Sequence, residues 1–208
     1  MKQAPVLSHG DEDEKVVALT FDDGYDAANT KKILGILKRY HVNATFFPTG
    51  RAVLQAPHMW RDIAAAGFPI ADHTFSHPTM SDLCFGAQLT ELKRQARAVH
   101  SVAGIRVQPY MRPPYEAWNR TTRIATTAAG QVAVVIWNID TRDWAGSTVK
   151  TITRRALHGD NGAIVLMHTM VGDTAIALPD IIRAYRARGF RFVTIGQMLG
   201  IEGPVPYG

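Results

Sequence analysis

The chain is organised around one stretch near its N-terminus, Val16-Val17-Ala18-Leu19-Thr20-Phe21-Asp22-Asp23-Gly24. An apolar run of this length that stops at a glycine predicts a fully buried strand. Two neighbouring carboxylates at its end repel each other, and burial adds to the cost of their charge, so a bound cation would stabilise them. Asp and Gly are also common turn residues, so a plain strand-ending turn is the competing interpretation.

On both sides of this stretch, apolar strands alternate with helical patterns. We expect strands at residues 16–21, 42–47, 68–72, 108–111, 132–137, 163–167 and 190–194. We expect helices from near residue 29 or 30, at 57–66, 81–103, 119–129, 147–158 and 175–188, and a terminal helical turn at 195–199. This alternation predicts an α/β fold in which helices cover a parallel sheet.

Polar residues follow the ends of five expected strands: Asp22 and Asp23, His73, Arg112, Asp140 and Asp143, and His168. The strand ends of a barrel converge on one face, whereas an open doubly wound sheet would spread them apart, so we expect a barrel. A full eight-fold barrel takes about 250 residues. The 208 residues of this chain therefore predict a shortened or incomplete (β/α) barrel with about seven repeats. We expect residues 1–14 to be a flexible or surface-lying lead-in and residues 15–208 to form one domain.

The composition is that of one globular domain, with 46% hydrophobic and 20% charged residues. The net charge of +5 could favour an anionic partner such as a bacterial wall polymer or a nucleic acid. Because the basic residues are dispersed and accompany no nucleic-acid-binding motif, we expect no nucleic-acid partner. We also expect a monomer.

No apolar run approaches the roughly 20 residues that a transmembrane helix needs, so we expect no transmembrane segment. The first 15 residues contain no apolar segment of the signal-peptide type. Either the protein stays inside the cell or a leader has been removed. Cys84 is the single cysteine, which excludes an internal disulfide, and we expect it to be a small core residue.

His73-Thr74-Phe75-Ser76-His77 places two imidazoles four residues apart, so on one helical turn they would point the same way. Together with a carboxylate of Asp22-Asp23 they would form a set of two histidines and one carboxylate. Catalytic zinc sites use three such ligands and keep a position open for water and substrate. Two loop histidines without a ligand are the alternative. Non-haem iron oxygenases use a similar set, but the β/α alternation argues against them.

Two further groups could take part in chemistry. His168 follows an apolar strand, and Asp140 or Asp143 could keep it protonated as a general acid requires, although a structural histidine is the alternative. Arg112 is followed by two prolines that fix the backbone, so the next N–H belongs to Tyr115 and could stabilise an oxyanion. A stiff turn with a surface arginine is the alternative there.

Five motifs occur in one order: Thr-Phe-Asp-Asp-Gly, His-Thr-x-x-His-Pro, Arg-Pro-Pro-Tyr, Asp-x-x-Asp-Trp and Ile-x-Leu-x-His. With them the chain resembles the polysaccharide deacetylases of carbohydrate esterase family 4, over roughly residues 16–200. The resemblance implies a distorted (β/α) barrel and metal-dependent removal of acetyl groups from N-acetylglucosamine units of peptidoglycan or chitin-type oligomers. The implied metal is Zn²⁺, with Co²⁺ or another divalent transition metal as the alternative.

The resemblance also implies roles for single residues. Asp22 would be the general base, and Asp23 would bind the metal together with His73 and His77. The sequence pattern alone does not divide these roles between the two aspartates. Arg112 would orient Asp22.

The remaining roles concern the acyl group and the leaving amine. The backbone N–H of Tyr115 would stabilise the oxyanion, and His168, paired with Asp143, would be the general acid. Trp144 and Leu166 would shape a pocket for the acetyl methyl group, and Tyr115 would also contact the substrate.

Two departures from the family pattern leave the substrate open. Tyr25 stands where many members have proline, and Glu116 stands where many have glycine. Three other functions therefore stay in view: an O-acetyl esterase on acetylxylan, a non-catalytic metal-stabilised carbohydrate-binding domain, and an amidohydrolase that acts on a small amide. A polymeric substrate implies a secreted or cell-envelope protein, with a cytoplasmic one as the alternative.

Overall fold

A computed structural model describes residues 2–201 of the chain. These residues form two compact units. The first unit contains residues 2–7 and Phe47–Ile136, and the second contains Ser8–Phe46 and Trp137–Ile201. Each unit combines parallel strands with helices, which confirms the predicted α/β class.

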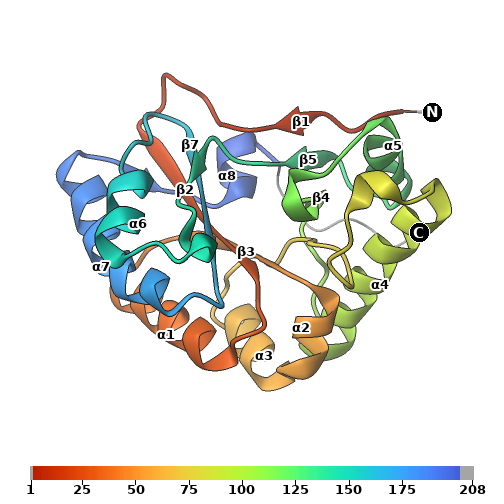
Figure 1. Cartoon of the computed structure of the whole chain (residues 1–208), viewed down its shortest axis with the longest axis horizontal. Helices are drawn as coiled ribbons and strands as arrows, with labels where there is room; N and C mark the ends of the chain where they lie inside the picture. Colours follow the sequence, from red (N-terminus) through yellow and green to blue (C-terminus); the bar gives the residue numbers. More distant parts are fainter. Residues whose placement is uncertain (1, 202–208) are drawn as a thin grey trace. The chain divides into compact units, whose positions relative to one another are not determined.

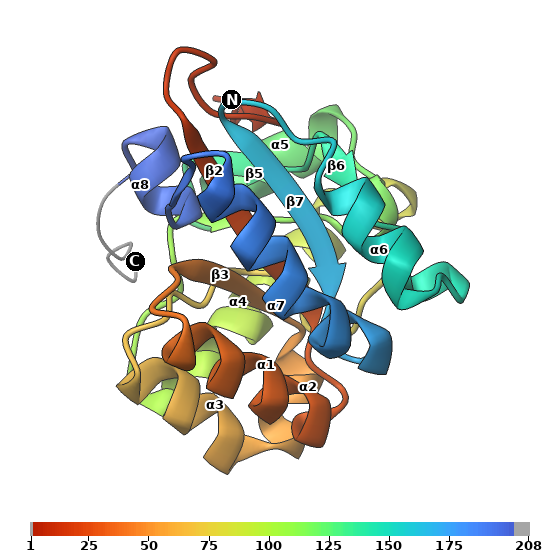
Figure 2. The same cartoon turned by 90° about the vertical axis from the view of Figure 1, so that its left-hand side faces the viewer.

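The sheet of the second unit is built around two long buried strands, β2 (Val16–Asp23) and β7 (Ala163–His168), which pair in parallel (Figure 2). The short strand β8 (Arg191–Phe192) pairs with β2, and β6 (Ile139–Asp140) pairs with β7. All eight residues of β2 are buried. The predicted strand therefore exists and extends two residues further, through both aspartates.

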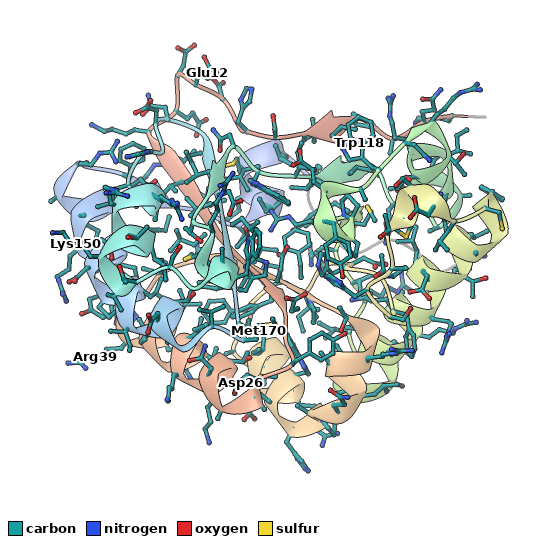
Figure 3. All side chains as sticks on the ribbon, in the orientation of Figure 1. Glu12, Asp26, Arg39, Trp118, Lys150 and Met170 are labelled. Carbon is teal, nitrogen blue, oxygen red and sulfur yellow. The ribbon has the colours of Figure 1, made fainter. Side chains whose placement is uncertain are left out.

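Helices of the second unit are α1 (Ala27–Arg39), α6 (Val149–Ala156), α7 (Gly172–Ala187) and α8 (Ile195–Leu199). The side chain of Asp26 accepts the N–H of Asn29, so α1 begins at a capped end two or three residues before the predicted start. Both α1 and α6 pack against α7. Figure 3 shows Arg39 on α1 and Lys150 on α6 extending from the surface, and both residues are exposed.

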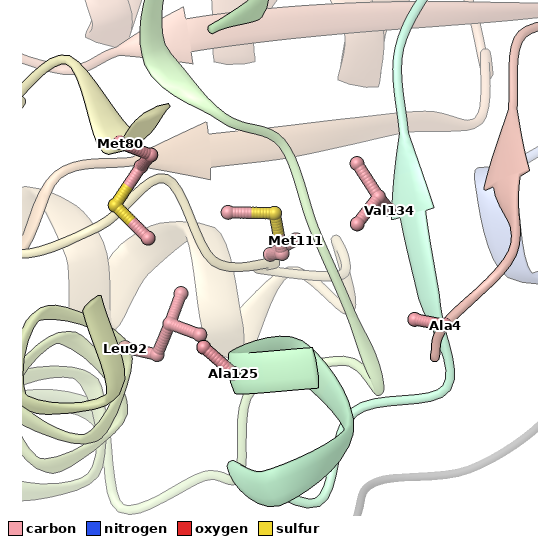
Figure 4. Packing of buried hydrophobic residues seen from close by; sticks show 6 residues of the cluster. All are labelled: Ala4, Met80, Leu92, Met111, Ala125 and Val134. Carbon is pink, nitrogen blue, oxygen red and sulfur yellow. The ribbon is translucent and has the colours of Figure 1, made fainter. Parts of the chain in front are cut away.

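The first unit has a small parallel sheet in which β5 (Ala133–Val135) lies between β1 (Val6–Leu7) and β4 (Tyr110–Met111) (Figure 1). Its helices are α2 (Gly50–Gln55), α3 (Pro57–Ala65), α4 (Phe85–Ala103) and α5 (Arg120–Ala128). Figure 4 shows a buried apolar cluster of this unit, formed by Ala4, Met80, Leu92, Met111, Ala125 and Val134. Strand β3 (Ala44–Pro48) contains the point where the chain passes from the second unit to the first.

Three short 3₁₀ turns complete the described elements: η1 (Met80–Asp82), η2 (Pro114–Glu116) and η3 (Asp143–Ala145). Two of them carry residues that the sequence marked as functional. None of the helices within residues 2–201 combines the length and the apolar character that a membrane crossing requires.

Several sequence predictions are wrong in detail. Residues 68–72 form no strand, and Asp72 is connected to Met111 through an isolated bridge. The lead-in is not merely a surface segment, because Val6–Leu7 pairs with β5 and Ala4 is buried. The sequence pattern predicts no helix after the strand at 42–47, whereas α2 begins at Gly50, directly after β3 and Thr49. Cys84 is exposed just before α4 and is not a core residue.

The close approach of two backbone segments at Gly162 gives a stability prediction. Gly162 has a φ of +73°, and a Cβ there would lie 2.7 Å from the carbonyl oxygen of Asp11 and 2.9 Å from that of Gly10. Gly146 has a similar φ of +70° but no neighbour within 4 Å of its Cβ position. Gly146→Ala should therefore cost about 1 kcal/mol for the left-handed backbone alone.

Gly162→Ala should lower the free energy of unfolding by about 1–3 kcal/mol more than Gly146→Ala does, because the backbone atoms beside Gly162 cannot shift without straining the structure. Urea unfolding of the two variants measures the difference. Equal losses would show that the contact between residues 10–11 and Gly162 does not contribute to stability.

Candidate active site

The parallel register of β2 and β7 brings two predicted site residues together. Asp22 at the end of β2 lies opposite His168 at the end of β7. Asp22 and Asp23 expose only 2% and 6% of their surface. Asp23 has a φ of 76°, a left-handed conformation that Asp adopts more readily than most residues. The aspartate pair is therefore a buried, sharply turned strand end.

Thr169, the residue after His168, holds this turn. Its N–H and its hydroxyl both donate to the carbonyl oxygen of Asp22, at 3.1 and 3.0 Å, and its hydroxyl oxygen accepts the N–H of Gly24 at 2.7 Å. The side-chain amide of Asn29 donates to the carbonyl of Thr169 at 2.6 Å. The sequence motifs do not single out Thr169 or Asn29, although the position of Thr169 directly after His168 is a usable signal for the first.

Asp143 is the carboxylate that holds His168. Its Oδ1 accepts the Nδ1–H of His168 at 2.7 Å, and its Oδ2 accepts the backbone N–H of His168 at 2.7 Å and the hydroxyl of Thr174 at 2.5 Å. Asp140, the other candidate, instead accepts the N–H of Arg142 and lies 3.8 Å from its guanidinium. With Nδ1 bound to Asp143, the Nε2 of His168 is the nitrogen left for chemistry.

The environment of His168 favours its protonated form. Burial alone would lower its pKa, but the hydrogen bond and charge of Asp143, together with the charges of Asp22 and Asp23, raise the pKa to about 9. A histidine with this pKa carries a proton at neutral pH and can donate it. Its contribution to folding stability is fully present below pH 6.5 and is lost as the pH rises through about 9.

The histidine pair belongs to the first unit. His73 and His77 have ring centroids 5.0 Å apart, and the edge of His77 packs on Tyr115 at 4.6 Å. The Nδ1–H of His73 donates to the carbonyl oxygen of Arg112 at 2.8 Å, which leaves Nε2 as the nitrogen with a lone pair. The segment is not helical, because Thr74 and His77 have φ of 65° and 64°. The predicted helical turn is therefore wrong, although the two rings are neighbours.

Arg112 is a fully buried cation, so the surface-arginine interpretation is wrong. Its Nε and Nη2 donate to the carbonyl oxygens of Val135 and Ile136, both at 3.3 Å, and its guanidinium lies 4.2 Å from the Phe47 ring centroid. A buried charged group is costly unless its N–H donors are hydrogen-bonded, and these carbonyl oxygens accept hydrogen bonds from Arg112.

The turn after the two prolines contains consecutive left-handed residues. Tyr115 has a φ of 59° and Glu116 a φ of 56°, a left-handed conformation that glycine would adopt with less strain. Tyr115 is 70% exposed and Trp144 58% exposed, whereas Leu166 is 3% exposed in β7. The roles of Trp144 and Leu166 in an acetyl pocket stay predictions.

Asp23, His73 and His77 are a group of donors that could hold a metal ion. Two imidazoles and one carboxylate are donor types of catalytic zinc sites. The contact of His73 with a backbone carbonyl is the kind of outer contact that fixes a metal-binding imidazole. These residues therefore fit the divalent metal that the resemblance implies.

Residues 9–134 match the model of the polysaccharide deacetylase family. This match covers more than half of the chain, and the chain belongs to that family. The fold of its solved relatives is a distorted barrel of seven β/α repeats, in agreement with the class predicted from the sequence.

Among the relatives, the peptidoglycan-N-acetylglucosamine deacetylase PgdA of Listeria monocytogenes is 33% identical over 187 residues, covering 89% of this chain. The chain spans only 39% of the length of that relative. A chitooligosaccharide deacetylase of Bradyrhizobium is 34% identical, with 88% of this chain and 90% of the relative covered. The crystal structure of the Bc1960 peptidoglycan N-acetylglucosamine deacetylase has a TM-score of 0.89 at 31% identity, over 95% of this chain and 94% of the other.

The contact between His168 and Asp143 predicts the effect of a single charge. Asp143→Asn keeps an oxygen that can accept the Nδ1–H but removes the negative charge, so the pKa of His168 should fall below that of the wild type. NMR titration of the His168 ring in the metal-free protein measures this change. Asp140→Asn is the matched control and should leave the pKa unchanged, because Asp140 pairs with Arg142. An unchanged pKa of His168 in Asp143→Asn would show that the charge of Asp143 does not raise this pKa.

Proposed function

We propose that the protein is a metal-dependent hydrolase that removes acetyl groups from N-acetylglucosamine units of a polysaccharide, either peptidoglycan or chitin-type oligomers. One observation carries this proposal: Asp22 lies opposite His168, whose Nδ1–H donates to Asp143, and this contact raises the pKa of the histidine. A site that only binds saccharide needs neither a buried base nor a poised acid. The family to which the chain belongs supports the same conclusion.

In this proposal Asp23, His73 and His77 bind the metal, which is zinc or, as the alternative, cobalt or another divalent transition metal. A divalent ion in such a site lowers the pKa of a bound water and polarises an acyl oxygen. The imidazole and carboxylate donors suit zinc.

The chain's own residues supply the proton transfers. Asp22 accepts a proton from the attacking water and is oriented by the Arg112 guanidinium. The N–H of Tyr115 donates to the acyl oxygen as negative charge develops there, and one such donor is typically worth about 10²–10³ in rate. The Nε2–H of His168 then protonates the departing amine, and acetate leaves.

The substrate choice rests on three supports. The relatives include enzymes named for peptidoglycan and for chitooligosaccharides. The net charge of +5 favours an anionic wall polymer over a neutral oligomer. The exposed rings of Tyr115 and Trp144 can pack on sugar faces. A wall polymer as substrate would require a secreted or envelope-bound protein.

Removal of the acid should separate chemistry from metal binding. His168→Ala should lower kcat for acetate release by about 10²–10⁴, the usual contribution of general acid catalysis, with zinc affinity retained. The control is His41→Ala, an exposed histidine of the same unit, which should leave kcat unchanged. Near-normal turnover of the zinc-loaded His168→Ala protein would exclude the assigned role.

A substrate panel tests the reaction class. Acetate release should be highest on peptidoglycan or chitin oligomers, should be lost with a chelator and should return with zinc or cobalt. Release from acetylxylan alone would establish an O-acetyl esterase instead. Saccharide binding without acetate release would establish a binding domain, and activity confined to small amides would establish an amidohydrolase.

A further inference from the structure

The segment between the two histidines is held in a strained conformation. Thr74 and His77 both have left-handed φ values, and Thr is β-branched, which makes this conformation unusual for it. Such conformations are strained and persist only where the surroundings fix them. The spacing of the two imidazoles therefore depends on contacts from outside the segment.

Glu91 on α4 makes the main contact to the backbone of this segment. Its Oε2 accepts the N–H of Phe75 at 3.0 Å and the N–H of Ser76 at 2.7 Å, and its Oε1 accepts the hydroxyl of Ser76 at 3.0 Å. The N–H groups of the flanking residues Thr74 and His77 are accepted by Asp72 Oδ1 at 2.8 Å and by Thr74 Oγ1 at 3.2 Å. Side-chain oxygens thus replace the carbonyl acceptors that a helical turn would use.

The carbonyl side of the segment is held by the first residues of α2. The N–H of Gly50 donates to Thr74 O and the N–H of Arg51 donates to Phe75 O, both at 3.0 Å. A Cβ on residue 50 would lie 2.5 Å from the Phe75 ring, so only glycine permits this approach. On α4, the Arg94 guanidinium stacks 3.8 Å from the Phe75 ring centroid. Because α2 and α4 also pack against each other, the contacts from α2 and the contacts of Glu91 on α4 hold the segment from two sides.

We propose that Glu91 is a positioning residue that sets the geometry of the His73–His77 pair for metal binding; this inference rests on the proposed metal site. Loss of the carboxylate would leave the N–H groups of Phe75 and Ser76 without their acceptor in a half-buried place, at a cost in free energy. The segment would relieve this cost by leaving its left-handed conformation, and the ring of His77 would move with it. Loss of an outer contact of this kind typically weakens metal affinity about 10–100-fold.

Zinc titration of the full chain, by competition with a fluorescent chelator, tests the proposal. Glu91→Ala should raise the zinc Kd about 10–100-fold relative to the wild type. In metal-free Glu91→Ala, the amide hydrogens of Phe75 and Ser76 should exchange with solvent faster than in the metal-free wild type. Glu91→Gln should stay close to the wild type, because its amide oxygen can accept both N–H groups and its NH₂ can donate to the Ser76 hydroxyl.

Glu12→Ala removes the same charge from an exposed position of the other unit and should leave both the Kd and the amide exchange unchanged. If Glu91→Ala does not fold, Glu91→Asp, which retracts the carboxylate by one methylene, takes its place with the same expectation. A folded variant with wild-type Kd and exchange overturns the role of Glu91 alone. A wild-type chain that binds no divalent metal overturns the proposed function and this inference with it.

Discussion

The parallel pairing of β2 with β7 is the constraint on which the second unit depends. Its register sets Asp22 opposite His168. A shift of one residue would turn every side chain of a strand to the opposite face and separate the two groups. The apolar residues before Asp22 are fully buried and fix that register, so hydrophobic burial determines where the ionisable groups meet. The charge of Asp143 then decides the protonation of His168.

Among the described residues, strained backbone conformations occur mainly at or beside the proposed active-site residues. Apart from His41, the non-glycine residues with positive φ belong to the sequence motifs or adjoin them: Asp23, Thr74, His77, Tyr115, Glu116 and Arg142. Such conformations persist only where the surroundings fix them. Thr169 does so for the turn at Asp23, and Glu91 and Asp72 do so for the histidine segment. The polar contacts around the site thus hold its ligands and proton donors in conformations that the local sequence disfavours.

The sequence predicted the α/β class, the main strands and the pairing of His168 with a nearby carboxylate, because hydrophobic periodicity and strand-end polarity are local signals. The residue pattern alone could not separate Asp140 from Asp143, because that choice follows from hydrogen bonds that only the folded chain makes, whereas the family resemblance correctly implied Asp143. It missed β1 and α2, whose two and six residues are too short for a periodic pattern. It also missed Glu91, because no local pattern connects a residue of α4 to partners 15 and 16 positions earlier along the chain. The helical turn expected for His73 and His77 failed because side-chain oxygens accept the N–H groups of that segment.

We propose that Asp23, His73 and His77 together bind one divalent ion. X-ray absorption at the zinc edge of the zinc-loaded protein measures this coordination. The expected spectrum has a first shell of nitrogen and oxygen at about 2.0–2.2 Å, with the outer-shell scattering of two imidazole rings. A spectrum without imidazole scattering would exclude this site.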